Sequence, residues 1–289
     1  MSQNHTMMQF FEWHILPDGT HWKRLKELAS ELKDKGIDSV WIPPPTKAQT
    51  PEDTGYGIYD LYDLGEFDQN GSIRTKYGTK DELIEAIEAC KENDICVNAD
   101  VGMNHKARED ETERFKVIEV DQNNRMKEIS GPFDIDGWTK FTFPGRGDTY
   151  SSFKWNVEHF NGTDYDEGTV RTGIFKILGD HKGWNDNVDL EFGNYDYLMF
   201  ANIDYNHPVV REEMIKWGKW LTETLQCDGY RLDAVKHIDY TFIRDFALEM
   251  HQTHGDHFYM FGEYWNPDLK ACQEYLQKVE FTVDLIDVP

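Results

Sequence analysis

Residues 228–237 read Asp228-Gly229-Tyr230-Arg231-Leu232-Asp233-Ala234-Val235-Lys236-His237, the pattern of a short apolar strand that runs into a loop. Side chains alternate between the two faces of a strand, so Arg231 and Asp233 are expected on the same face. A fixed cation beside a carboxyl group favours its charged form, and we therefore expect Arg231 to keep Asp233 ionised. The stretch predicts a carboxylate held by an arginine at the carboxyl end of a strand.

A second stretch further along the chain repeats this design. It reads Tyr259-Met260-Phe261-Gly262-Glu263-Tyr264-Trp265 and delivers Glu263 from the end of another apolar strand. Two carboxylates and a guanidinium at strand ends are the parts needed to break a glycosidic bond. Glu263 has apolar and aromatic neighbours, which suits a general acid.

Strand and helix patterns alternate around these two stretches. Short strand candidates lie at 9–13, 38–43, 95–101, near 229, near 259 and at 281–286. Helical stripes separate them: one contains Trp22, Leu25, Leu28, Ala29 and Leu32, and another opens with a capping box at Thr79 and Glu82. Alternation of this kind predicts parallel βα units.

The alternation stops between Lys106 and Asn206, where Gly, Asp, Asn and aromatic residues dominate. We interpret this segment as a β-rich insertion after the third strand. The predicted organisation is therefore a first barrel segment at 1–105, an insertion domain at 106–206 and a second barrel segment at 207–289.

Charge and composition exclude several classes of partner. The formal net charge of −24 argues against nucleic acid and anionic membranes, because both need a basic patch. No apolar run is long enough to cross a bilayer and no signal peptide is visible, so we expect a cytoplasmic protein. The four cysteines form no Cys-x-x-Cys pair and are interpreted as reduced thiols. The oligomeric state does not follow from the sequence.

Two further motifs complete a family pattern. They are Asp100-Val101-Gly102-Met103-Asn104-His105 and Gly55-Tyr56-Gly57-Ile58-Tyr59-Asp60-Leu61-Tyr62-Asp63. With the two strand-end stretches, they make the chain resemble the alpha-amylase family, glycoside hydrolase family 13. The segments Met8-Gln9-Phe10-Phe11-Glu12-Trp13 and Asn194-Tyr195-Asp196-Tyr197-Leu198-Met199 resemble bacterial liquefying-type and cytoplasmic alpha-amylases in particular.

The resemblance implies an α/β fold, a TIM-type (β/α)8 barrel with a β-rich insertion domain after strand three. About six of the eight strands are expected here. The family's third catalytic carboxylate lies in an Asn-His-Asp segment after strand seven, and no histidine follows Glu263. The chain therefore looks truncated, and we expect it to be a poor catalyst by itself.

The resemblance also implies roles for individual residues. Asp233 would be the nucleophile and Glu263 the general acid and then base of a retaining mechanism, with Arg231 orienting Asp233. His105 would donate to a hydroxyl of the reacting glucose. Tyr56 would stack on that glucose, and Lys236 and His237 would contact the leaving-group side. Trp13 and Trp265 would line the cleft or pack in the core, and the sequence leaves both readings open.

One calcium ion is expected from the family at the junction of barrel and insertion. Its ligands would be Asn104, Asp196, Asn202 and the main-chain oxygen of His237. Asparagines stand at 161, 185, 202 and 206, where related enzymes commonly carry aspartates, and each such change weakens calcium binding. A metal-free hydrogen-bond network is the alternative.

The predicted function is endo-hydrolysis of α-1,4-glucosidic bonds in starch, glycogen or maltodextrin with retention of configuration. Alternatives are a transglycosylating or exo-acting relative, and a non-catalytic glucan-binding fragment, which the missing third carboxylate would favour. The sequence does not distinguish the preferred glucan or the product length.

Overall fold

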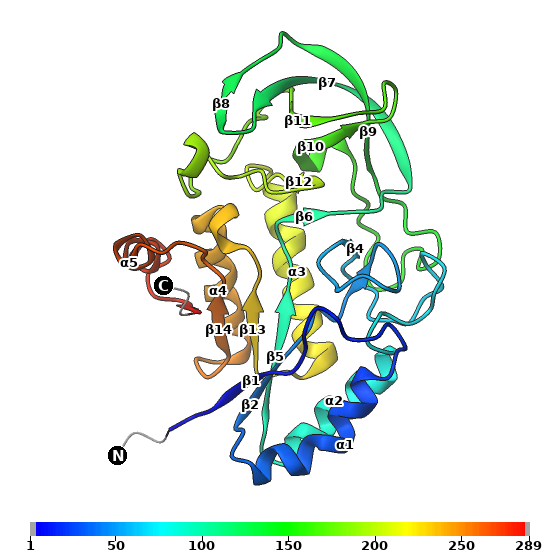
Figure 1. The fold of residues 1–289 in the computed structure, drawn as a ribbon, viewed down its shortest axis with the longest axis vertical. Coiled ribbons are helices and arrows are strands. Elements are labelled where there is room, and N and C mark those ends of the chain that lie inside the picture. Colours follow the sequence, from blue (N-terminus) through cyan, green and yellow to red (C-terminus); the bar gives the residue numbers. More distant parts are fainter. Residues whose placement is uncertain (1–3, 287–289) are drawn as a thin grey trace.

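Six strands pair in one parallel sheet, in the order β1 (Met7–Gln9), β2 (Ser39–Ile42), β5 (Cys96–Val101), β13 (Gly229–Leu232), β14 (Tyr259–Gly262) and β15 (Asp284–Leu285). A computed structural model of the chain describes residues 4–286, so the outer ends of the first and last predicted segments lie outside the described residues. The strands curl into part of a barrel (Figure 1). This confirms the predicted incomplete (β/α)8-type barrel.

Helices follow the barrel strands and cover the sheet from outside. They are α1 (His21–Asp34), α2 (Lys80–Glu92), α3 (Pro208–Leu225), α4 (Tyr240–His254) and α5 (Leu269–Lys278). The predicted capping box opens α2, where the Thr79 side chain accepts from the Glu82 amide and the Glu82 carboxylate accepts from the Thr79 amide. In α1 the predicted stripe is buried except for Leu28, which is only partly buried.

A second sheet is built by the insertion after the third barrel strand. Its antiparallel strands are β6 (His105–Lys106), β12 (Ala201–Ile203), β10 (Phe160–Asp166), β11 (Arg171–Ile177), β7 (Glu111–Asp121), β8 (Asn124–Glu128) and β9 (Phe133–Lys140). This sheet lies beyond one end of the barrel. Its strands β6 and β12 pair with each other next to the barrel (Figure 1). A β-rich insertion was predicted at this place in the chain.

Short elements complete the structure. A hairpin of β3 (Lys47–Ala48) and β4 (Ile58–Asp60) follows β2, and one-turn helices lie at η1 (Val157–His159), η2 (Glu191–Gly193) and η3 (Val235–His237). The described helices include none with the length and apolarity to span a bilayer.

Candidate active site

Arg231 lies at the centre of a buried cluster of carboxylates. The register of the barrel sheet places Arg231 of β13 directly beside Asp100 of β5. Its Nη1 donates to Asp100 Oδ1 at 3.0 Å and to Asp233 Oδ1 at 2.7 Å. Its Nη2 lies 3.0 Å from Glu263 Oε2. One guanidinium therefore joins three carboxylates from the ends of three neighbouring strands, and the predicted contact between Arg231 and Asp233 is confirmed.

Asp100 is fixed by two further donors. The Trp41 indole Nε1 donates to Asp100 Oδ2 at 2.9 Å, and the Tyr56 hydroxyl donates to the same atom at 2.8 Å. Burial raises the pKa of Asp100, and the Arg231 guanidinium opposes that rise. Sequence reasoning missed Trp41. Strand alternation could have found it, because Trp41 lies in β2 on the face opposite the buried Val40 and Ile42.

Asp233 stands at the point where β13 turns into η3. Its amide donates to the Val101 carbonyl at 2.9 Å, and the next residue, Ala234, adopts a left-handed conformation with φ of 52° that turns the chain. Burial raises the pKa of Asp233 to about 7, although Arg231 acts in the opposite direction. Arg231 thus favours the ionised form of Asp233, as expected, whereas burial acts against it with the larger effect.

Glu263 follows β14 and reaches back toward β13. Its amide donates to the Leu232 carbonyl at 3.0 Å. Its side chain accepts from the Ala234 amide at 3.2 Å and from the Trp265 indole at 2.5 Å, besides the contact with Arg231. The carboxyl group is thus oriented by three donors from two neighbouring strand ends.

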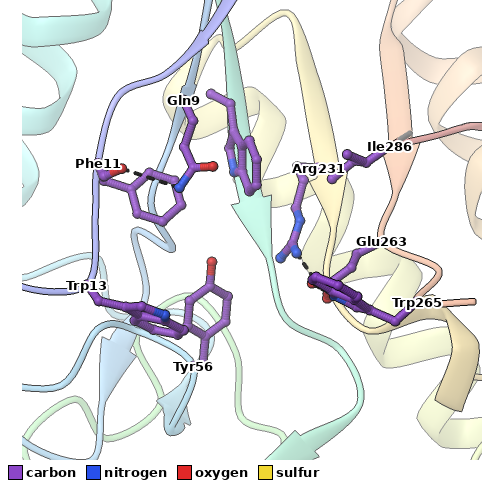
Figure 2. Close-up of a pocket in the computed structure, with 9 residues that line it drawn as sticks. Gln9, Phe11, Trp13, Tyr56, Arg231, Glu263, Trp265 and Ile286 are labelled. Atoms are coloured by element: carbon purple, nitrogen blue, oxygen red, sulfur yellow. Dashed lines mark hydrogen bonds and ion pairs between the residues drawn. The ribbon is translucent and has the colours of Figure 1, made fainter. Parts of the chain in front are cut away.

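A pocket of about 400 Å³ opens beside this cluster. Trp13 and Tyr56 form one wall, and Glu263 and Trp265 lie across from them (Figure 2). The rings of Trp13 and Tyr56 meet edge to face, with centroids 5.5 Å apart. Trp13 is 61% exposed and Trp265 is 63% exposed, so both line the pocket and neither packs in the core. The remaining lining residues are Gln9, Phe11, Trp41, Arg231 and Ile286.

His105 contacts the main chain of Tyr56 and does not line that pocket. Its Nε2 donates to the Tyr56 carbonyl at 2.9 Å, and its Nδ1 accepts from Asn104 Nδ2 at 3.2 Å. Burial lowers the pKa of His105 to about 4, which keeps the ring neutral. Since both nitrogens contact protein atoms, the expected donation to a sugar hydroxyl does not follow from this geometry. The contacts suit a residue that positions Tyr56.

Lys236 and His237 line a second pocket of about 390 Å³ on the other side of Glu263. The Lys236 ammonium donates to the Trp265 carbonyl at 2.8 Å and forms an ion pair with Glu191. His237 Nδ1 donates to the Tyr195 carbonyl at 2.8 Å. Glu191 comes from the insertion, and sequence reasoning missed it because nothing local marks it as a partner of Lys236.

Comparison with known proteins places this geometry in a family. Residues 25–286 match the family model described as alpha amylase, catalytic domain. The chain belongs to the alpha-amylase family. It is 50% identical over 287 residues to a glucan 1,4-alpha-maltohexaosidase of Bacillus sp. (strain 707), and 50% identical over 286 residues to an alpha-amylase of Bacillus licheniformis. It is 43% identical over 290 residues to a cytoplasmic alpha-amylase of Escherichia coli (strain K12).

These alignments cover 99% of this chain but only 55%, 56% and 59% of the three relatives, so the chain spans little more than half their length. Among solved structures, an alpha-amylase from Geobacillus thermoleovorans complexed with acarbose matches with a TM-score of 0.61. That match covers 98% of this chain and 51% of the other at 19% identity, and it supports the fold alone.

The alpha-amylase family implies a calcium ion at the junction of barrel and insertion, and the residues there do not fit one. Asp196 is buried, and its oxygens accept from the Asn161 amide at 2.7 Å and the Asn185 main-chain amide at 2.9 Å. N–H groups thus point at the carboxylate that a cation would need. Asn185 Oδ1 is a side-chain oxygen at this junction that lacks a hydrogen-bond partner. One such oxygen is too few for calcium, which takes six to eight oxygen ligands.

Two of the other expected ligands, Asn202 and Asn104, belong to the same set of contacts. Asn202 Nδ2 donates to Asn161 Oδ1 at 2.8 Å, and Asn104 Nδ2 lies 3.5 Å from Asn202 Oδ1. Within residues 4–286, no group of three or more His, Cys, Asp or Glu side chains could hold a metal ion. The contacts at this junction are those of a hydrogen-bond network.

Proposed function

We propose that this alpha-amylase chain carries the nucleophile and the acid/base of an enzyme that hydrolyses internal α-1,4-glucosidic bonds of starch, glycogen or maltodextrin. The observation that supports the proposal is the contact of Asp233 and Glu263 with different nitrogens of the one Arg231 guanidinium, next to an aromatic-lined pocket. Because both nitrogens are bonded to one carbon, the two carboxyl groups lie close together, as a retaining mechanism requires.

In the first step an Asp233 oxygen forms a bond to the anomeric carbon while the bond from that carbon to the glycosidic oxygen breaks. Glu263 gives its proton to the departing oxygen, and a glycosyl ester of Asp233 remains. In the second step a water attacks the anomeric carbon, Glu263 takes the proton of that water, and Asp233 leaves as a carboxylate. Arg231 holds both carboxyl groups in place and stabilises the charge that returns to Asp233.

Substrate contacts are proposed for the residues that line the two pockets. Tyr56 and Trp13 offer ring faces in the first pocket, Lys236 and His237 line the second, and Glu263 and Trp265 line both. Sugar rings have apolar faces that pack on aromatic side chains, and their hydroxyls pair with charged groups. We assign the segments 1–105 and 207–289 to the barrel domain and 106–206 to the insertion domain.

The proposed location rests on similarity. A cytoplasmic location is supported by the identity to a protein named cytoplasmic alpha-amylase, and cell fractionation tests it. Calcium is left out of the proposed chemistry, since the contacts around Asp196 do not fit the ion. The proposed partner is an α-glucan, with no role for nucleic acid or membrane.

The test is hydrolysis of maltoheptaose by the purified chain and by a version extended to the length of its relatives, with products separated by length and their anomeric configuration read by NMR. Endo action with retention gives several product lengths in the α form, whereas an exo-acting relative gives one length. Asp233→Asn and Glu263→Gln should each lower turnover by roughly a thousandfold or more. β-Anomeric products, or variants that keep the parent turnover, would overturn the proposal.

A further inference from the structure

The Lys182 ammonium occupies a site made of oxygen atoms at the junction between the two sheets. It donates to the Phe160 carbonyl at 2.7 Å and to the Glu158 carbonyl at 2.5 Å, and it lies 3.1 Å from Asp204 Oδ2. The Lys182 side chain is 11% exposed and that of Asp204 is 2% exposed. Two carbonyls and a buried carboxylate surround one positive charge here. Oxygen ligands of the same kinds surround a bound metal cation in a calcium site.

The elements that Lys182 joins lie far apart in the sequence. Lys182 follows β11, its two carbonyl partners lie at η1 and the start of β10, and Asp204 lies between β12 and α3. Asp204 is fixed in turn, because its Oδ1 accepts from the Asn206 amide at 3.0 Å. The ammonium therefore ties the insertion to the segment that leads back into the barrel.

Next to this ion pair lies the amide network around Asp196. Asn161 Nδ2 bridges the two regions, since it donates to Asp196 and also to the Gly183 carbonyl, which follows Lys182 in the chain, at 3.0 Å. Asn161, Asn185 and Asn202 are fully buried and neutral. Adding a divalent ion here would place it against N–H donors, with Asp196 as the carboxylate in the network.

We propose that this chain holds its barrel–insertion junction with a fixed internal cation, the Lys182 ammonium, and a network of neutral amides, in place of bound metal ions. Each buried carboxylate has its own partner: Lys182 for Asp204, and amide donors for Asp196. A covalently attached ammonium cannot dissociate, so the junction keeps its structure when metals are removed.

The network also reaches the proposed active site. Asn202 contacts Asn104, Asn104 donates to His105, and His105 donates to the carbonyl of Tyr56. Tyr56 in turn lines the pocket beside Glu263. A junction that needs no metal therefore holds the Tyr56 loop in place in the absence of calcium.

The first test compares thermal unfolding of the purified chain in excess EDTA and in millimolar CaCl₂, with metal analysis of the protein as purified. We expect the two Tm values to agree within about 1 °C and less than one equivalent of calcium to be bound. A Tm that rises with calcium by several degrees, or a stoichiometric calcium content, would overturn the proposal.

The second test removes the internal cation. Lys182→Met leaves Asp204 buried without a counter-charge, and breaking a buried pair this way should lower Tm by about 6 °C or more. Lys116→Met is the matched control, because Lys116 also pairs at 3.1 Å, with Asp134, but the two side chains are 63% and 41% exposed. Its Tm should stay within about 1 °C of the parent.

Two more variants keep the test decisive if Lys182→Met does not fold. Lys182→Arg retains the positive charge and should retain most of the parent Tm, whereas a fall of about 6 °C or more in this variant would count against the role of the positive charge. Asn161→Asp/Asn202→Asp adds negative charge around Asp196. This double variant should unfold at a lower temperature in EDTA and gain Tm on addition of calcium. No calcium response in it would show that amide neutrality is not what excludes the ion.

Discussion

Asp233 and Glu263 bind different nitrogen atoms of a single guanidinium, at 2.7 Å and 3.0 Å. The relationship arises from sheet register, because β13 pairs with β14 so that Arg231 lies beside Phe261, two residues before Glu263. Arg231 also contacts Asp100 on the other side. A buried arginine with three carboxylate partners can hold two of them in catalytic positions, and this geometry leads to the first prediction.

Arg231→Lys should lower kcat by roughly a hundredfold or more. A lysine ammonium is a point charge and cannot bind Asp233 and Glu263 through separate, rigidly spaced nitrogens. The measurement is steady-state hydrolysis of maltoheptaose. Arg114→Lys is the matched control, since Arg114 pairs with Asp136 at 3.1 Å on the exposed face of the second sheet. Similar turnover in both variants would contradict the assigned role.

Trp41→Phe should destabilise the chain by about 1–3 kcal/mol, because it removes a donor from the buried Asp100 carboxylate. Tyr56→Phe removes the second donor from the same oxygen and should have a similar effect. The measurement is urea unfolding. Trp138→Phe serves as control, since its indole donates to Glu167 in an exposed contact. In the double variant the two losses of unfolding free energy should not add, because Trp41 and Tyr56 donate to the same oxygen of Asp100.

Asp233 makes one contribution to the pH dependence of stability. Its pKa is raised from 3.8 to about 7 by burial, so the folded chain keeps a proton that the unfolded chain has already released. The free energy of unfolding should therefore contain a contribution that is present below about pH 4 and is lost as the pH rises to about 7.

Asp233→Asn removes this contribution, so the variant should show a shallower fall in stability across that range than the parent. Urea unfolding at a series of pH values measures both slopes. Identical slopes would show that burial does not raise the pKa of Asp233.

Trp13→Ala should leave the free energy of unfolding within about 0.5 kcal/mol of the parent, since the ring is largely exposed. Its KM for maltodextrin should rise severalfold, because the pocket loses an apolar wall. Trp22→Ala is the contrasting variant. Trp22 is fully buried in the core, and its loss should destabilise the chain by about 3–5 kcal/mol. A large stability loss in Trp13→Ala would contradict its place in the pocket wall.

Local pattern was enough to predict where the strand-end carboxylates and Arg231 lie. Alternation along β13 puts Arg231 and Asp233 on one face, and the same pattern in β14 delivers Glu263, so these positions follow from strand geometry and parallel pairing. The capping box at Thr79 and the stripe on α1 are likewise local. The first strand was predicted at 9–13 but lies at Met7–Gln9, because pairing of Met7 with Ser39 and of Gln9 with Trp41 sets its position.

Contacts between distant segments were decided only by the tertiary structure. Trp41 reaches Asp100, Glu191 reaches Lys236, and Lys182 reaches Asp204, and no short-range pattern links the members of these pairs. The pKa of Asp233 was also decided by the tertiary structure. The neighbouring Arg231 is visible in the sequence, whereas the burial that outweighs its effect is not. Desolvation and amide orientation depend on what surrounds a group in three dimensions. For that reason the sequence predicts which groups lie at the candidate site, and the fold decides how each is charged and held.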